Sequence, residues 1–500
     1  MKIQDIIQKI EVTSLYVPDE LYRRTVLSLC HNSKTACPTC AFFCKKGAAT
    51  DGHDYAYAAY LNGARIFVAE RELSLPSDAA VIITPNSAAA LATLAVDFYG
   101  DPAKKMRLIG ITGTKGKTTV AISLYNIATA RGVACGYIGT NGIYYNGKQL
   151  ETANTTPDVV QLQQTLAQML AEGVDTVFIE VSSQALWQER IYGLCFDTCV
   201  FTNLYTDHIG GVEHPTFEHY RDCKRLLFTN YPCKNIVINA DSPYCDFILD
   251  GLTDKNVLTV SAGGNEHCNI YAKSAIKLKS KNIPGVSFSC YINGRKHDVF
   301  IPMPGMHNVE NALLILGVCK IIGIEVSRAV SLLSNLTVNG RFETVKLNSR
   351  PNSLFIIDYA HNGASLTAVL KSLREYEPQR IICLFGSVGG RTFGRRRELG
   401  EAARDYSDVL IITSDNPNRE PPMSVINEIN AAIGQTDKPV YLIPDRKEAI
   451  QKAVEIARDG DYVLLAGKGH ETYQLIGGER IEFSERKILA LADALYAAEV

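Results

Sequence analysis

Apolar and polar positions divide the chain into three stretches with different patterns. In the first hundred residues, a helical pattern at 55–61 leads into an apolar strand pattern at 63–68. An alanine-rich segment, 87–99, also has a helical pattern. The polar segment 100–105 contains glycine and proline and breaks that helix. A domain boundary is therefore expected near residues 102–106.

Beyond Met106, apolar segments of strand length alternate with helical segments. The candidate strands are 107–112, 134–139, 176–181, 198–203, 235–239 and 257–260. The alternation pauses near 336–340 and resumes with strands at 353–358, 380–385, 408–413 and 461–465. This alternation predicts parallel sheets covered by helices. The expected fold class is α/β, with three domains at 1–105, 106–338 and 339–500.

Length and composition are those of an ordinary globular protein. A chain of 500 residues is too long for one hydrophobic core. The net charge of −2 gives no basic excess, so nucleic acid is not expected as a partner. The N-terminal segment lacks the apolar region of a signal peptide, and the longest apolar runs are too short to span a membrane. A cytoplasmic location is expected.

Four of the fourteen cysteines lie close together in the sequence, at Cys30, Cys37, Cys40 and Cys44. A zinc or redox site is one interpretation of this spacing. A strand and turn that use cysteine is the other. Neither a second Cys-x-x-Cys nor a pair of histidines accompanies the cluster, so the second interpretation is favoured. The scattered remainder indicates free thiols in a reducing compartment.

The strand at 107–112 runs directly into a glycine-containing loop, and an apolar helix follows. The loop consists of Gly113, Thr114, Lys115, Gly116, Lys117, Thr118 and Thr119. Glycines let backbone N–H groups approach phosphate oxygens, and the helix N-terminus adds partial positive charge. Lys117 is expected to reach the β- and γ-phosphates and Thr118 to hold Mg²⁺. Ile111 stands where a standard P-loop has its first glycine, so this loop is a variant.

Polar residues follow two further strands of the central stretch. Glu180 ends the strand at 176–181, where a carboxylate suits a hard cation. Asn203, Asp207 and His208 follow the next strand; by composition alone, a structural role fits His208 equally well. The helix expected at 216–228 places Tyr220 and Lys224 on one face.

In the last stretch a polar or small-residue loop follows each of four strands, at 359–362, 386–391, 415–418 and 467–471. The carboxyl ends of parallel strands lie along one edge of a sheet, where ligands bind. One such loop is more often a turn than a site. Four together predict a single functional site.

The order and spacing of these motifs resemble the central ATPase domain of the Mur ligase family. The motifs are Gly113–Thr119, Glu180–Ser183, Asn203 with Asp207 and His208, and Tyr220 with Lys224. The segments 154–156, 415–417 and 467–471 narrow the resemblance to the MurE branch. It extends over essentially the whole chain, including Asp51-Gly52 and Gly63-Ala64.

The resemblance implies a small N-terminal α/β domain that binds UDP, a central P-loop-type parallel-sheet ATPase domain and a C-terminal Rossmann-like domain for the amino acid. It implies UDP-muramoyl-peptide contacts from Ser33, the loop 47–50, Asn154, Thr155, Thr156, Ser182, Gln188 and Arg190. It implies ATP contacts from Asn308, Asn311, Arg341 and Asp358 beside the glycine loop. It implies amino-acid contacts from Arg391, Asp415, Asn416, Pro417, Asn418, Gly467 and Glu471.

The implied catalytic residues are Lys117, Glu180, His208 and Lys224, and the implied metal ligands are Thr118, Glu180, His208 and Lys224. Lys224 resembles a lysine that becomes N6-carboxylated, which gives an anionic ligand in place of an ammonium that would repel Mg²⁺. The implied reaction uses ATP and Mg²⁺ to convert a D-glutamyl carboxylate into an acyl phosphate, which the incoming amine attacks. It belongs to peptidoglycan precursor synthesis. We expect small-molecule substrates only, a monomer, and a hinge near 336–340 that closes the site.

The incoming amino acid is less strongly indicated. Family members that add meso-diaminopimelate are expected to carry Asp-Asn-Pro-Arg, whose arginine reads the distal carboxylate. Asn418 stands at that arginine's place, which favours L-lysine or another diamino acid without a distal carboxylate. Arg419, one residue later, leaves diaminopimelate open. Two further departures are Gln184, where the family has histidine, and Asn32-Ser33-Lys34, where it has Asp-Ser-Arg.

Two other functions are consistent with parts of the pattern. A sister amide ligase, such as a folylpolyglutamate synthetase, shares the ATPase motifs, but the N-terminal domain and Asn154-Thr155-Thr156 argue against it. A catalytically silent paralogue would bind nucleotide alone. A catalytically silent protein is disfavoured because the chain retains all four implied catalytic residues, Lys117, Glu180, His208 and Lys224.

Overall fold

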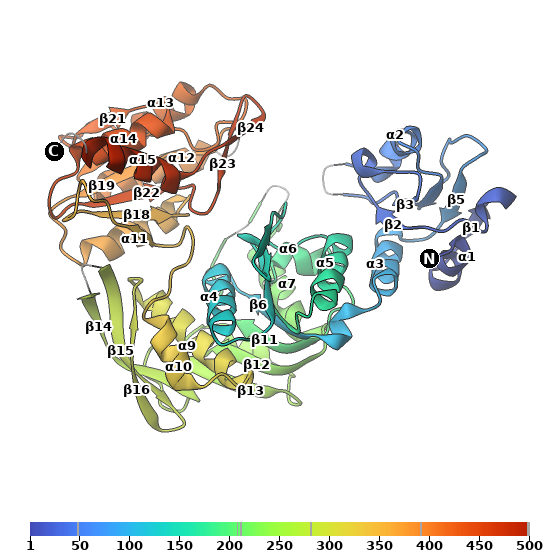
Figure 1. Cartoon of the computed structure of the whole chain (residues 1–500), viewed down its shortest axis with the longest axis horizontal. Helices are drawn as coiled ribbons and strands as arrows, with labels where there is room; N and C mark the ends of the chain where they lie inside the picture. Colours follow the sequence, from blue (N-terminus) through green and yellow to red (C-terminus); the bar gives the residue numbers. More distant parts are fainter. Residues whose placement is uncertain (48–49, 208, 211–212, 281–282, 391–392, 498–500) are drawn as a thin grey trace. The chain divides into compact units, whose positions relative to one another are not determined.

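The computed structural model describes residues 1–47, 50–207, 209–210, 213–280, 283–390 and 393–497 (Figure 1). The chain divides into two compact units, Met1–Val260 and Ser261–Val500. His208 and Arg391 lie outside the described residues, as do residues 48–49 of the loop expected near uridine. The boundaries expected near 105 and 338 stay predictions.

The first unit begins with a five-stranded sheet of strand order β1-β5-β4-β3-β2. Its strands are β1 (Ser14–Tyr16), β2 (Ser28–Cys30), β3 (Cys40–Phe43), β4 (Ile66–Ala69) and β5 (Ala80–Ile83). Its helices are α1 (Ile3–Lys9), α2 (Ala56–Leu61) and α3 (Ser87–Phe98). All neighbours pair in parallel except β1 with β5. The expected helices at 55–61 and 87–99 and the strand at 63–68 are therefore confirmed within a few residues.

A second, mainly parallel sheet follows in the first unit, with the order β9-β8-β7-β10-β6-β11-β12-β13. Its strands are β6 (Arg107–Thr112), β7 (Cys135–Gly139), β8 (Gly142–Tyr145), β9 (Lys148–Leu150), β10 (Thr176–Glu180), β11 (Phe196–Phe201), β12 (Cys233–Asn239) and β13 (Asn256–Ser261). Its helices are α4 (Lys117–Ala130), α5 (Val159–Ala171), α6 (Ser183–Trp187), α7 (Phe217–Thr229) and α8 (Cys245–Leu249). The six strands from β7 to β13 in this order are parallel, which confirms the parallel-sheet prediction. Two short antiparallel strands, β8 and β9, extend the edge.

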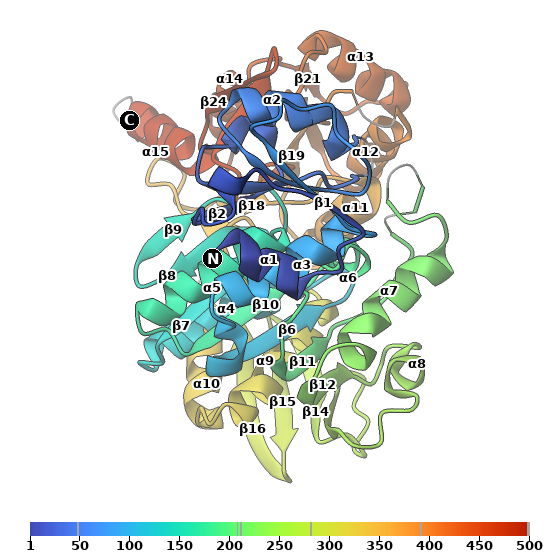
Figure 2. The ribbon, with the colours of Figure 1, turned by 90° about the vertical axis from the view of Figure 1, so that its right-hand side faces the viewer.

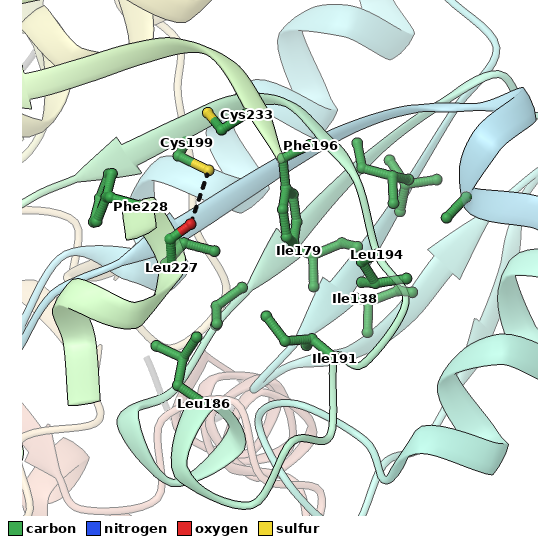
Figure 3. Packing of buried hydrophobic residues seen from close by; sticks show 14 of the residues in the cluster. Ile138, Ile179, Leu186, Ile191, Leu194, Phe196, Cys199, Leu227, Phe228 and Cys233 are labelled. Atoms are coloured by element: carbon green, nitrogen blue, oxygen red, sulfur yellow. Dashed lines mark hydrogen bonds between the residues drawn. The ribbon is translucent and has the colours of Figure 1, made fainter. Parts of the chain in front are cut away.

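The direction of each crossover decides which face a helix covers. The chain passes from β6 to β7, β8 and β9 in one direction along the sheet, and from β9 through β10, β11, β12 and β13 it moves in the other. Right-handed crossovers therefore put α4 on one face and α5 to α8 on the opposite face. On the face covered by α5 to α8, Ile191, Leu194 and Phe196 pack toward Ile138 and Ile179 (Figure 3). Helices α7 and α8 contact each other (Figure 2).

The second unit begins with three antiparallel strands that the sequence analysis did not assign. They are β14 (Ile270–Ser280), β15 (Ile283–Ile292) and β16 (Arg295–Ile301), and α9 (Met306–Ile321) and α10 (Val326–Leu333) follow. Val286, Phe288, Cys290 and Ile292 are buried on β15, with less buried residues between them. That alternation is a period of two rather than the continuous apolar run of a parallel strand.

The second unit ends in a six-stranded sheet of order β17-β18-β22-β19-β20-β21. Its strands are β17 (Glu343–Val345), β18 (Leu354–Asp358), β19 (Ile381–Phe385), β20 (Val409–Ile412), β21 (Val440–Leu442) and β22 (Tyr462–Ala466). Its helices are α11 (Gly363–Arg374), α12 (Phe393–Tyr406), α13 (Pro422–Ile433), α14 (Arg446–Ile456) and α15 (Glu485–Ala497), with a hairpin of β23 (Tyr473–Ile476) and β24 (Glu479–Glu482). Only β17 is antiparallel, so the four expected strands and their parallel pairing are confirmed. No helix in the described ranges is long and apolar enough to cross a membrane.

Candidate active site

The glycine loop between β6 and α4 requires glycine for steric reasons. Gly113 has φ of +147°, and a Cβ there would lie 1.9 Å from the Thr202 hydroxyl oxygen. Gly116 takes the left-handed conformation immediately before α4. Asn203 fixes the loop from outside, because its backbone oxygen accepts from Thr114 N–H at 2.9 Å and its side-chain oxygen accepts from Lys115 N–H at 2.9 Å.

Lys117 and Lys224 meet at one backbone oxygen. The Nζ atoms of both lysines lie 2.9 Å from the carbonyl oxygen of Gly113. Lys224 comes from α7 and is only 1% exposed. Burial lowers the pKa of Lys224 well below its ordinary value, and the charge of Lys117 lowers it further. A lowered pKa increases the fraction of neutral amine relative to an exposed lysine, and the neutral amine is the form that reacts with carbon dioxide.

Glu180 ends β10 with its side chain fully buried and enclosed by hydrogen-bond donors. Thr118 donates its hydroxyl to one carboxylate oxygen at 2.8 Å. Tyr137 and the Thr140 backbone N–H donate to the other at 2.5 and 3.0 Å. A Cβ on Gly139 would lie 2.2 Å from that oxygen, so glycine is needed beside the carboxylate.

The structure thus brings the side-chain oxygens of Thr118 and Glu180 together, and oxygen is the ligand atom that Mg²⁺ prefers. These residues fit the implied cation. Tyr137 and Thr140 were missed by the sequence analysis. Thr140 follows the carboxyl end of the expected strand 134–139, and that position was an available signal.

The residues expected at the muramoyl peptide form a hydrogen-bonded group next to Glu180 and Thr140. Thr156 donates its hydroxyl to the Glu180 carbonyl oxygen at 2.8 Å and accepts from the Ser182 N–H at 3.1 Å. Arg190 donates to the Thr156 carbonyl at 3.1 Å and to the Gln188 side-chain oxygen at 2.8 Å. The Thr155 hydroxyl lies 3.0 Å from that of Thr140. Asn154 is exposed beside them.

Lys45 adds a cation that the sequence analysis did not select. It precedes the loop expected near uridine and is partly buried. Burial lowers the pKa of Lys45; the charge of Arg190 also lowers it, and Asp158 opposes both. Burial likewise lowers the pKa of Arg190. Two partly desolvated cations near one carboxylate suit an anionic ligand.

Ser33 begins a short 3₁₀ turn, and its carbonyl oxygen accepts from the Asn62 side chain at 2.8 Å. Asn32 caps this turn by accepting from the Lys34 N–H at 3.0 Å. The neighbouring Cys30 is buried and donates to the Asn32 carbonyl oxygen at 3.1 Å. These contacts give Asn32 a structural role at one of the positions that depart from the family pattern.

The remaining residues expected at ATP belong to the second unit. Asn308 and Asn311 are buried in the first turns of α9, where Asn311 donates to the Asn308 side-chain oxygen at 3.2 Å. Arg341 lies over the Tyr359 ring at 4.9 Å. Burial raises the pKa of Asp358, although Arg341 opposes that shift.

The loops after β19, β20 and β22 meet at one edge of the C-terminal sheet. Lys468 contacts the Asn416 side-chain oxygen at 2.8 Å, Glu471 at 2.6 Å and Asp415 at 3.7 Å. Asn416 also donates to Glu471 at 3.1 Å. The loop after β18 joins them through the Tyr359 ring, 4.9 Å from that of His470. The structure therefore gathers the four loops as the sequence predicted.

Glycines set the spacing of these loops. A Cβ on Gly467 would lie 2.8 Å from an Asp415 carboxylate oxygen, and one on Gly389 would lie 2.0 Å from the Pro417 carbonyl oxygen. Asn418 is in the left-handed conformation, with φ of +57°. Its side-chain amide donates to the Gly389 carbonyl oxygen at 3.0 Å.

Arg446 donates hydrogen bonds to the backbone where two of these loops begin, a role that the sequence did not predict. It is fully buried and pairs with the buried Glu485 at 2.7 Å. It also donates to the carbonyl oxygens of Ser414 and Ala466, at 3.3 and 2.8 Å, just before Asp415 and Gly467. No local pattern marks this role, since a charged residue in the first turn of a helix is usually solvated.

Three family models match successive parts of the chain. The one described as "Mur ligase family, catalytic domain" matches residues 26–99, "Mur ligase middle domain" matches 111–319, and "Mur ligase, glutamate ligase domain" matches 340–469. Together they correspond to the three-domain architecture.

Curated proteins are similar over nearly the whole length. A UDP-N-acetylmuramoyl-L-alanyl-D-glutamate–2,6-diaminopimelate ligase of Clostridium botulinum is 36% identical, over 90% of this chain and 91% of the relative. A protein of the same name from Caldanaerobacter subterraneus is 38% identical, over 93% and 94%. A solved structure of a ligase of that name aligns with a TM-score of 0.67 at 27% identity, covering 99% of both chains. The structure of a MurF ligase from Thermotoga maritima in complex with ADP aligns with a TM-score of 0.59 at 18% identity, covering 97% of this chain and 100% of that one. This similarity supports the fold alone.

Proposed function

The chain belongs to the Mur ligase family of ATP-dependent amide ligases, and we propose that it adds a diamino acid to UDP-N-acetylmuramoyl-L-alanyl-D-glutamate. The D-glutamyl carboxylate attacks the γ-phosphoryl group of ATP, and ADP leaves. The amine of the incoming amino acid then attacks the acyl phosphate, forming the amide bond and releasing phosphate. This coupling yields one ADP and one phosphate for each bond.

The residues around Gly113 support the first step. The loop's backbone N–H groups and Lys117 hold the phosphates and offset charge on the transferred group. Thr118 and Glu180 are suited to hold Mg²⁺, which, when bound, offsets further phosphoryl charge. Lys224 is a buried amine with a lowered pKa, and addition of carbon dioxide to its neutral form releases a proton and leaves an anionic carbamate facing the same region. His208 stays a proposed ligand from the motif alone.

The single observation that carries the proposal is the convergence of Lys117 and Lys224 on the Gly113 carbonyl oxygen, each at 2.9 Å. A silent nucleotide-binding protein has no use for a buried lysine amine beside its phosphate loop. Burying that amine costs folding free energy, and titratable groups perturbed in this way cluster at functional sites.

The test measures ATP-dependent phosphate release and mass-spectrometric product formation with UDP-N-acetylmuramoyl-dipeptide and a panel of amino acids. Phosphate release matched by a tripeptide product supports the proposal. Nucleotide binding without turnover would favour a silent paralogue. Turnover only with a folate or another acceptor would favour a sister ligase.

We infer L-lysine, or another diamino acid without a distal carboxylate, as the preferred amino acid. Asn418 carries no charge, and its amide is committed to the Gly389 carbonyl oxygen. A distal carboxylate placed there would find no guanidinium. The second candidate is meso-diaminopimelate, which is favoured by the names of the relatives, both 2,6-diaminopimelate ligases, and by the neighbouring Arg419.

Asn418→Arg is expected to raise the diaminopimelate-to-lysine ratio of kcat/KM by about 10- to 100-fold, because a charge-assisted bidentate contact contributes about 1.5–3 kcal/mol. Initial rates with both amino acids measure the ratio. Asn418→Ala is the matched control, since it removes the amide without adding charge and should leave the ratio near wild type.

An unchanged ratio in Asn418→Arg would count against this assignment of the position. Arg419→Gln tests the second candidate separately. If wild type uses diaminopimelate and Arg419→Gln loses that use selectively, Arg419 reads the distal carboxylate and the lysine preference is wrong.

A further inference from the structure

Three side chains of types that can ligate metals lie together around the start of α7 and have no part in the proposed reaction. His214 precedes the helix, and His219 and Cys223 stand four residues apart within it. One ligand atom from each lies within 4.8 Å of the others. The two histidine Nδ1 atoms are 2.9 Å apart, and the Cys223 sulfur is 3.8 Å from Nδ1 of His219.

The donor set selects a class of metal. Imidazole nitrogen and thiolate sulfur suit Zn²⁺ and related ions, whereas Mg²⁺ takes oxygen. With Zn–N near 2.0–2.1 Å and Zn–S near 2.3 Å, tetrahedral geometry separates nitrogen from nitrogen by roughly 3.3 Å and nitrogen from sulfur by roughly 3.6 Å. The two distances here differ from these by a few tenths of an ångström, which side-chain rotation can supply.

The surroundings hold the imidazoles in place. His214 is fully buried, and its Nε2 lies 2.9 Å from the hydroxyl of Ser183, the first residue of α6. With Nδ1 as the ligand, Nε2–H donates to that hydroxyl and fixes both the tautomer and the ring orientation. The Trp187 ring packs on His219 and His214 at 5.2 and 5.9 Å.

We propose that His214, His219 and Cys223 bind a divalent transition-metal ion of the Zn²⁺ class, with water in the fourth position. The site is separate from the Mg²⁺ site and needs neither ATP nor an amino acid. His219 and Cys223 directly precede Tyr220 and Lys224. A bound ion therefore fastens the segment before α7 to the helix that carries the reactive lysine. The competing explanation of the 2.9 Å distance is a hydrogen bond between the two imidazoles.

The experiment uses the full-length protein, stripped by a chelator and kept in excess Mg²⁺, and titrates it with Zn²⁺ and separately with Co²⁺. Trp187 is the single tryptophan of the chain, so its fluorescence reports binding at this cluster. Wild type is expected to bind about one ion per chain. It should change in fluorescence on saturation and, with Co²⁺, show a thiolate charge-transfer band.

Cys223→Ser and His219→Gln are each expected to weaken binding by about 10- to 100-fold or more and to abolish the fluorescence change. Cys223→Ser should also lose the cobalt–thiolate band. His219 is only partly buried, so its variant keeps the test decisive if the serine variant does not fold. Cys37→Ser, in the separate N-terminal cysteine cluster, is the matched control and should behave as wild type.

Three outcomes overturn the site. The first is an absence of saturable binding in wild type, which leaves the hydrogen bond between imidazoles as the explanation. The second is a cobalt band that persists in Cys223→Ser. The third is a band lost in Cys37→Ser, which moves the metal to the other cysteines.

Discussion

Lys117→Met is expected to lower kcat by about 10²- to 10³-fold, the cost of removing one preorganised donor from a developing anion. Methionine keeps the length and apolar stem of lysine but carries no charge for the phosphoryl oxygens. Lys117 now donates to the carbonyls of Gly113 and Thr114, at 2.9 and 3.1 Å, so it is already held within the loop. Steady-state phosphate release at saturating ATP measures the loss.

Lys105→Met is the control for this experiment, since Lys105 is exposed just before β6. It removes the same charge and should retain the wild-type kcat. A kcat for Lys117→Met within threefold of wild type would remove Lys117 from phosphoryl transfer. Circular dichroism and thermal unfolding of each variant separate loss of chemistry from loss of fold.

Lys224→Met is expected to lower kcat by about 10²- to 10³-fold without lowering the unfolding temperature. The buried amine has a lowered pKa because desolvation disfavours its charge, so an apolar side chain of similar volume removes an unfavourable burial. The Gly113 carbonyl oxygen still accepts from Lys117 in the variant. Activity and stability are therefore expected to respond differently, and kcat and thermal unfolding measure the two.

Carbon dioxide separates a carbamate from a purely structural lysine. Wild-type protein in degassed, carbon-dioxide-free buffer is expected to lose activity and to regain it with bicarbonate. A carbon-13 carbamate signal should appear in wild type and be missing in Lys224→Arg, whose guanidinium stays charged. Full activity without carbon dioxide would leave Lys224 only as a hydrogen-bond donor.

The central sheet was predictable because its strands are continuous apolar runs with abrupt ends. Strand β6 matches its expected bounds, since Arg107 begins it and the glycine loop follows Thr112. Strands β14 to β16 escaped notice because their apolar residues alternate with polar ones, as in Val286, Ser287 and Phe288. That pattern marks an antiparallel strand with one solvated face.

The placement of Lys117 and Lys224 together, and of Glu180 beside Thr118, was predictable from the motifs, while their catalytic roles stay predictions. The residues that enclose Glu180 were not predictable. Tyr137 lies on a strand that is hydrogen-bonded to β10, and only the strand order β7-β10-β6 brings its hydroxyl to the carboxylate. Lys45 was missed for the same reason, because its charged neighbours Asp158 and Arg190 are more than a hundred residues away in the sequence.

Because Lys117 and Lys224 share the Gly113 carbonyl oxygen, nucleotide binding at Lys117 and carboxylation of Lys224 are expected to influence each other. On the proposed carboxylation, carbon dioxide would turn Lys224 from a hydrogen-bond donor beside Lys117 into an anion and so change the electric field at the proposed triphosphate site. Any nucleotide that binds one form of Lys224 more tightly must shift its carboxylation by the same factor. The ambient carbon dioxide level is thereby expected to act on this ligase as an input to its nucleotide affinity.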